Sequence, residues 1–234
     1  MSRFTVIPQD TFQELQLDAG ILLNTFNPAN PSVTDTDIIT ATTGGITVAC
    51  VPTYSDFGED VDNCPNNTKE LKHLDGWECT ITTTALGTSP EAIRLALGAA
   101  DITDNSSYAL TTDTEIAAGK TYYTRSGTSP NYTYTAVTTP SAQSLSSYYE
   151  KTGGGKITPR ADLAQTDFSD IWWVGDRADG GMVAVQLKNA LSTGGFSLQT
   201  TKNGKGQISL TLTGHVSINA QNVVPMEFYS TEGE

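Results

Sequence analysis

The 234-residue sequence is poor in charged side chains, and positively charged ones are the scarcest. Charged residues make up 17% of the chain, below the roughly 25% of ordinary soluble domains. Lysine and arginine number 13 against 26 aspartates and glutamates, which gives a formal net charge of -13. This balance argues against wrapping nucleic acid, because phosphate binding needs Lys and Arg to replace the released counterions. An acidic surface can still serve a nucleic acid by repelling it, as the wall of a smooth channel must.

Cysteine and long apolar runs are also scarce. The three cysteines, Cys50, Cys64 and Cys79, form an odd set, so a disulfide framework is not expected. No apolar run approaches the roughly 20 residues of a membrane span, and the N-terminal residues lack the apolar region of a signal peptide. We therefore expect a protein that is made in a cytoplasm and has no membrane partner.

Thr, Ser, Gly and Asn fill the place of the missing charges, and these residue types suit strands and turns. Apolar and polar residues alternate most clearly at residues 207–213, within a strand that is expected at residues 207–218. The strand at residues 46–51 is expected to end at Pro52. Further strands are expected at residues 15–23, 77–82, 171–174, 182–191, 196–200 and 223–229. The sequence therefore predicts a mainly β fold.

One helix is predicted, over about residues 90–100. Ser89 is a favoured N-cap, Pro90 suits the first helical position, and Glu91 complements the positive helix end. Apolar residues such as Ile93 and Leu97 recur at spacings of three and four, which gives the helix one face to pack on a sheet.

Residues 104–155 differ in kind from the rest. They are rich in Thr, Ser and Tyr, and they end in the glycines 153–155, which indicate a flexible joint. Short alternating runs at residues 121–125 and 132–137 predict a small β-meander with its own aromatic cluster. The segment has three basic and four acidic side chains, so its net charge is -1 and the remainder of the chain carries -12. We expect a main domain in two parts, residues 1–103 and 156–234, interrupted by an inserted small β module at 104–155.

Motifs for catalysis or phosphate binding are incomplete. Residues 56–58 match the Asp-Phe-Gly triplet of kinases, but no Gly-rich loop, catalytic loop or partner lysine accompanies them. The glycines before Lys156 suggest a phosphate-binding loop, yet Glu150 and Ile157 stand where glycine and Ser or Thr are required. The two histidines, His73 and His215, lie in no recognisable nucleophile context. We expect neither an enzyme nor a bound cofactor.

Metal-binding patterns fail in a similar way. Asp60 and Asp62 begin like a calcium loop, but Cys64 occupies the third ligand position and Pro65 replaces the glycine. Looser calcium binding by these clustered carboxylates is an alternative to a solvated loop. A zinc site built from Cys64, His73 and Cys79 is not expected, because the spacings are irregular and no CxxC pair exists.

Large aromatic residues are candidates for the core or for an interface. Trp172 and Trp173 are adjacent, and neighbouring strand residues face opposite ways, so we expect one core Trp and one surface or interface Trp. Phe196 and Phe228 are further candidates of this kind.

From Phe168 to Tyr229 the sequence resembles the major tail proteins, or tail tube proteins, of long-tailed bacteriophages of Gram-positive bacteria. The resemblance is carried by the order of the elements more than by any single motif. The matching segments are residues 168–176, 182–191, 206–215 and 225–228, with residues 12–20 and 90–101 fitting the same pattern.

The resemblance implies a β-sandwich or barrel with one flanking α-helix, whose subunits form homo-hexameric rings that stack into the tail tube. Such a tube is the conduit for DNA delivery, and DNA passes through its lumen without specific binding. The implied partners are other copies of the chain, the tape measure protein, and tail terminator or baseplate proteins at the tube ends. The implied location is the virion tail, assembled in the host cytoplasm. The inserted segment resembles small β modules of other phage structural proteins.

The acids expected to face the lumen are Asp56, Glu59, Asp60, Asp62, Asp176 and Asp179, with solvated loops on the outer surface as the alternative.

The alternative function is a phage baseplate or fibre module that binds a receptor or carbohydrate, which exposed aromatics around Tyr122, Tyr132 and Tyr148 would support.

Overall fold

The computed structural model describes residues 9–59 and 61–233. The chain is mainly β, with 46% strand and 11% helix, and its one helix of seven or more residues is α1 (Pro90–Leu97). The expectation of a mainly β class is thereby confirmed. The chain divides into two compact units, of which the first comprises Met1–Ala100 and Pro159–Glu234 and the second comprises Asp101–Thr158.

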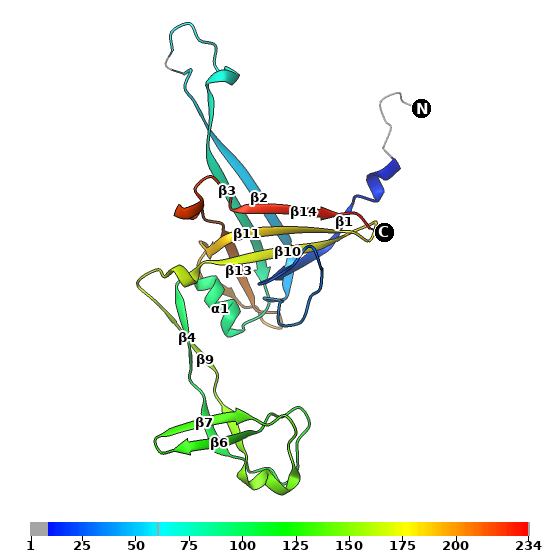
Figure 1. The fold of residues 1–234 in the computed structure, drawn as a ribbon, viewed down its shortest axis with the longest axis vertical. Coiled ribbons are helices and arrows are strands. Elements are labelled where there is room, and N and C mark those ends of the chain that lie inside the picture. The colour runs from blue at the N-terminus through cyan, green and yellow to red at the C-terminus, as the bar shows by residue number, and fades with distance from the viewer. Residues whose placement is uncertain (1–8, 60, 234) are drawn as a thin grey trace. The chain divides into compact units, whose positions relative to one another are not determined.

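The first unit contains two antiparallel sheets that share one strand (Figure 1). One sheet has the order β1-β10-β11-β14, and the other joins the end of β11 to β13, β3 and β2, with β12 also on β13. The strands are β1 (Gln16–Leu23), β2 (Thr42–Asp56), β3 (Lys72–Ala85), β10 (Ser169–Arg177), β11 (Met182–Ser192), β12 (Leu198–Gln199), β13 (Gln207–Thr213) and β14 (Met226–Thr231). Short 3-10 turns occur at Gln9–Phe12, Lys69–Leu71, Gln165–Asp167 and Ile218–Ala220.

Strand β11 passes from one sheet to the other. Its first part, from Met182 to Leu187, pairs with β10 on one side and β14 on the other. Its last residues, Leu191 and Ser192, pair with β13. Between them Asn189 adopts a left-handed conformation with φ 47°, a geometry that asparagine tolerates better than most residues. Strand β11 is therefore one continuous strand that belongs to both sheets.

The main core lies between the two sheets and α1. In β13 the alternation places Ile208, Leu210 and Leu212 inside, each at most 2% exposed. The other buried members come from β1, β3, α1, β10, β11 and β14: Leu22, Cys79, Ile81, Ala85, Leu95, Ala96, Ile171, Val185, Leu187, Ala190 and Met226. A smaller cluster of Leu23, Trp172 and Ala184 is separate from it.

Helix α1 begins where its cap predicts, and it ends earlier than expected. The Ser89 Oγ accepts a hydrogen bond from the backbone N–H of Ala92 at 3.1 Å. Gly98, with φ 76°, closes the C-terminus, and its N–H donates to the carbonyl of Arg94. The prediction of a helix to about residue 100 was wrong, because glycine takes a positive φ without steric cost and stops the helix.

Two strand predictions also need correction. Strand β2 does not end at Pro52 but continues to Asp56, with Pro52 opposite Trp77. Because β2 is the outer strand of its sheet, a proline there does not interrupt an interior hydrogen-bond ladder. The strand expected at residues 196–200 shrinks to Leu198–Gln199, so Phe196 lies in the loop before it.

The second unit has a two-stranded ribbon and a four-stranded sheet. The ribbon pairs β4 (Ala100–Asp104) with β9 (Gly155–Pro159). The sheet has the order β5-β8-β6-β7, formed by β5 (Ser107–Leu110), β8 (Tyr149–Thr152), β6 (Tyr123–Thr128) and β7 (Asn131–Ala136). The predicted meander was therefore wrong. The chain after β7 runs through the 3-10 turn Ala142–Ser147 and inserts β8 between β5 and β6, where Tyr149 faces Tyr123.

Candidate functional site

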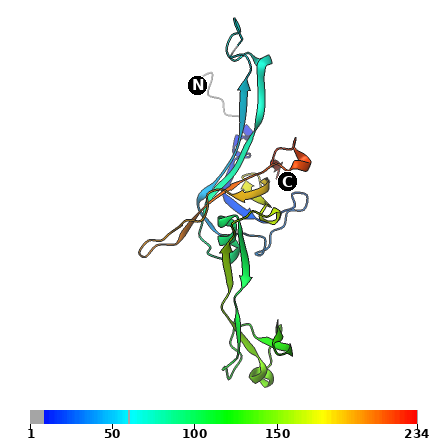
Figure 2. The same ribbon diagram turned by 90° about the vertical axis from the view of Figure 1, so that its left-hand side faces the viewer.

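The hairpin of β2 and β3 projects beyond the other strands of its unit (Figure 1 and Figure 2). Strand β13 pairs with β3 only from Ala85 to Thr80. Farther out, residues 50–56 of β2 and 72–79 of β3 pair with each other and with no third strand among the described residues. We call these two segments and the loop between them the distal hairpin.

An apolar stripe runs along the distal hairpin, and its large side chains are partly exposed to solvent. Alternate strand residues share a face, so Pro52 and Tyr54 continue the face of Cys50, which packs on the main core. Trp77 pairs with Pro52, and Leu74 pairs with Tyr54. The side chains of Tyr54, Leu74 and Trp77 are 58%, 43% and 39% exposed. A core-facing stripe thus extends past the core that would cover it.

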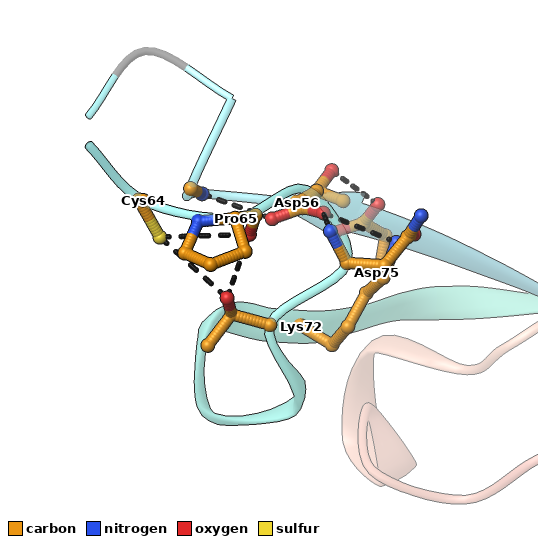
Figure 3. A network of polar contacts seen from close by, with 9 residues as sticks. Asp56, Cys64, Pro65, Lys72 and Asp75 are labelled. Atoms are coloured by element: carbon orange, nitrogen blue, oxygen red, sulfur yellow. Dashed lines mark hydrogen bonds and ion pairs between the residues drawn. The ribbon is translucent and has the colours of Figure 1, made fainter. Parts of the chain in front are cut away.

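The tip of the distal hairpin is held by a network around Asp56 (Figure 3). Its carboxylate accepts hydrogen bonds from the backbone N–H groups of Gly58 at 2.9 Å and Asn67 at 3.0 Å. Lys72 lies 3.4 Å from the same carboxylate. The Asp-Phe-Gly triplet is therefore a turn in which Asp56 fixes the two ends of the loop, and this carboxylate is only 7% exposed.

The network sets a pH dependence for the tip. The hydrogen bond from Gly58, aided by those from Asn67 and Lys72, lowers the pKa of Asp56 below 3.8. A carboxyl whose pKa is lowered on folding stabilises the fold above its unfolded-state value, and that contribution is lost as pH falls through the folded-state value. We expect an NMR titration to place the Asp56 midpoint below 3.8, with the amide nitrogens of Gly58 and Asn67 shifting together with it. In Asp56→Asn these two amides should show no such step, and an unshifted wild-type midpoint would contradict the network.

The acids predicted to line a channel fall into two separate groups. Glu59 and Asp62 are exposed at the tip of the distal hairpin near Asp56, whereas Asp60 lies outside the described residues. Asp176 is exposed at the end of β10. Asp179, in the turn to β11, is half-buried and pairs with Arg177 at 2.8 Å. The backbone N–H of Gly181 lowers the pKa of Asp179.

The cysteines and histidines are not gathered into a metal site. Among the residues that the structure describes, no group of three or more His, Cys, Asp or Glu side chains could hold a metal ion. Cys64 contacts the carbonyl of Pro65 and the hydroxyl of Thr68, whereas Cys79 is buried beside Cys50. One residue of the calcium alternative, Asp60, is not described.

The two tryptophans point to different clusters. Trp172 is 7% exposed, with its ring 5.7 Å from Phe26 and 5.5 Å from Tyr229. Trp173 is half-buried on the main core, and its Nε1 donates to the carbonyl of Ala19 at 3.0 Å. Both therefore serve packing within the first unit.

Two phenylalanines singled out in the sequence are exposed. Phe196 is 38% exposed in the loop before β12. Phe228 is 62% exposed on β14, a strand that pairs only with β11 among the described strands. An edge strand with an uncovered aromatic ring is a surface on which a further strand can pair.

In the second unit the tyrosines divide between core and surface. Tyr122 is fully buried and Tyr148 is 6% exposed, so these two rings do not give the carbohydrate-binding alternative the exposed aromatics that would support it. Tyr122 packs with Leu145 and Tyr148, and its buried hydroxyl is satisfied because it donates to Asp113 at 2.6 Å and accepts from the N–H of Ala117. The hydrogen bond to Asp113, followed by one to Glu150, raises the pKa of Lys120.

Another set of aromatic rings gathers on one face of the four-stranded sheet. Tyr108 and Tyr134 stack at 4.0 Å. The guanidinium of Arg125 lies 4.4 Å from the ring centre of Tyr132, which is 40% exposed, and 4.9 Å from that of Tyr149. Of the three tyrosines whose exposure would support carbohydrate binding, Tyr132 is the one that is open to solvent.

No protein-family model matches the sequence, and no curated protein matches it either. None of the described helices is long and apolar enough to cross a membrane.

Proposed function

We propose that this protein is a structural subunit of a long-tailed bacteriophage, a major tail protein whose hexameric rings stack into the tail tube. The observation that carries the proposal is the distal hairpin, where an apolar stripe continues past the core and stays partly exposed in the described part of the chain. Exposed aromatics of this kind suit contact with another protein surface. The resemblance of residues 168–229 to tail tube proteins supports a second copy of the chain as that surface.

The free sheet edges support the same proposal. Strand β14 pairs only with β11 among the described strands and carries the exposed ring of Phe228, and β2 is the outer strand of the other sheet. A ring needs a heterologous contact, in which one patch of each subunit meets a different patch of the next. The edge strands β14 and β2 and the distal hairpin differ from one another, so they can supply the two different patches.

The charge of the chain fits a conduit for DNA. The first unit carries most of the net charge of -13, and a ring multiplies it into a field of several kT. DNA has one negative charge per roughly 1.7 Å of its axis, so a basic wall would bind it and slow its passage. Glu59, Asp62 and Asp176 are the exposed candidates for the bore, whereas Asp56 and Asp179 are engaged within their own turns.

Negative-stain electron microscopy of the purified protein tests the proposal. Tubes built of stacked rings are the expected result. A reconstruction of such tubes also tests the bore, which should be lined by acidic or neutral side chains of the first unit. Discrete particles at every protein concentration, or a bore lined chiefly by Lys and Arg, would contradict the respective part of the proposal.

Removing the second unit is expected to leave assembly intact. The ribbon strands β4 and β9 bring the two chain passages of the insert together, and its clusters are formed within residues 101–158. Deleting residues 104–155 and joining Thr103 to Lys156 through a short Gly-Ser linker should still give tubes in the same microscopy. A folded deletion variant that stays dispersed would assign the insert to the assembly interface.

A baseplate or fibre module that binds carbohydrate is the second candidate. It is favoured by the open sheet face that carries Tyr132 and Arg125, because flat aromatic and guanidinium groups suit polar ring-shaped ligands. Binding of cell-wall glycan by discrete particles, lost in Tyr132→Ala, would favour this candidate over tube formation.

A further inference from the structure

Two cysteines lie directly opposite each other where the distal hairpin leaves the sheet. Cys50 of β2 is the register partner of Cys79 of β3, and their Sγ atoms are 3.1 Å apart. Both are free thiols in this structure. Opposed residues of antiparallel strands have Cα atoms about 4.5 to 5.5 Å apart, which lies within the roughly 4.4 to 6.8 Å that disulfides span. The backbone therefore already holds the spacing that a disulfide needs.

The two thiols differ in their access to solvent. Cys79 has no exposed surface and belongs to the main core, whereas Cys50 is only half-buried at the core edge. Burial, followed by the contact with Cys50, raises the pKa of Cys79 to about 12. A reagent in solution therefore meets Cys50 first.

We propose that Cys50 and Cys79 are a disulfide-forming pair, which closes by exchange with a small-molecule disulfide such as oxidised glutathione. The Cys50 thiolate attacks one sulfur of the reagent, the S–S bond of the reagent breaks, and one glutathione thiol leaves. Cys79 then attacks the Sγ of Cys50, its proton passes to the departing glutathione sulfur, and the second glutathione leaves as a thiol. Two protein thiols are oxidised, and one glutathione disulfide is reduced to two thiols.

The disulfide between Cys50 and Cys79 would cross-link the two strands where the distal hairpin leaves the sheet. One rung farther in, Ala49 pairs with Thr80, and Thr80 pairs with Thr213 of β13. The distal hairpin is the chain segment from Cys50 to Cys79, so the disulfide would close this segment into a covalent loop. Closing a loop restricts the unfolded chain and so stabilises the fold. Cys64 lies within the loop and contacts Pro65 and Thr68, which makes it a bystander thiol.

The test uses the full chain with Cys64→Ser, so that only the pair can react. The protein is incubated with oxidised glutathione, quenched with acid, alkylated after unfolding and weighed by intact-mass spectrometry. We expect two thiols lost, no glutathione retained, and a peptide that links Cys50 to Cys79. The melting temperature should rise by several degrees and return to its starting value on addition of a reductant.

Single-cysteine variants in the same background are the matched controls. With Cys79→Ala one glutathione should remain on Cys50, and no reductant-reversible rise in melting temperature should occur. With Cys50→Ala the buried Cys79 should stay unmodified while the protein is folded. The proposal is overturned if the paired protein keeps glutathione on Cys50 with Cys79 still alkylated, or if both thiols stay reduced in the folded protein but react once it is unfolded. The Cys64→Ser protein, which keeps both Cys50 and Cys79, distinguishes these outcomes without the single-cysteine variants. A control variant that folds poorly therefore does not change the conclusion.

Discussion

Replacing Tyr54 and Trp77 together with alanine should abolish tube formation while the subunit stays folded. The two rings are 58% and 39% exposed, and no third strand pairs with their part of the hairpin among the described residues. An aromatic hot spot at an interface contributes about 2 kcal/mol or more. Losing two of them should raise the protein concentration needed for assembly on the order of a thousandfold. Negative-stain microscopy and sedimentation measure the loss, and circular dichroism checks the fold.

Ile116→Ala is the matched control for this variant. Ile116 is 41% exposed, close to the 39% of Trp77, but it belongs to the second unit and not to the distal hairpin. Its removal should leave the concentration dependence of assembly unchanged. If the hairpin variant still forms tubes at the wild-type concentration, the apolar stripe has no part in the contact between subunits.

Trp172→Ala should cause the largest loss of subunit stability. Trp172 is 7% exposed and packs with Leu23 and Ala184, and Phe26 and Tyr229 lie against its ring. Truncating a buried Trp to Ala costs about 3 to 5 kcal/mol, because the apolar contacts are lost and a cavity remains. Urea unfolding of the dispersed subunit measures this loss, and the midpoint should fall at an unchanged m-value.

The same substitution at Trp77 separates packing from assembly. Trp77 is 39% exposed on the distal hairpin, so Trp77→Ala should change the free energy of unfolding of the dispersed subunit by only about 0.5 kcal/mol. Trp172→Ala should thus lower subunit stability and Trp77→Ala should weaken assembly. Equal destabilisation by the two variants would mean that the hairpin ring is part of the subunit core.

The sequence predicted best those elements whose signals are local. The two strands expected at residues 171–174 and 182–191 are β10 and β11, and Ser89 caps α1 as expected. Pro52 misled the prediction, since a proline ends a central strand but is tolerated on an edge, and edge position depends on the whole sheet. The insertion of β8 between β5 and β6 is likewise a long-range pairing that alternation within a segment cannot reveal.

The candidate site was predictable only in part. The acids around Asp56 were visible in the sequence, but their division into turn-forming and exposed carboxylates depends on hydrogen bonds to Gly58 and Asn67. The apolar stripe was missed, because an exposed alternating strand has the same pattern as a covered one. Predicting that Cys50 lies opposite Cys79 requires the register of β2 against β3. The bulge between Thr53 and Tyr54 shifts that register nearer the tip of the hairpin.

The insert also makes this chain a scaffold for foreign sequences. Its two ends meet within the first unit, where the N–H of Arg160 donates to the carbonyl of Ala99 at 3.0 Å. The 58 residues from Asp101 to Thr158 therefore take the place of a loop that connects two neighbouring segments of the first unit. Any domain whose termini lie about one strand spacing apart, roughly 4.8 Å, meets the same geometric demand. A peptide antigen or an enzyme grafted at this point would be carried once by every subunit of an assembly.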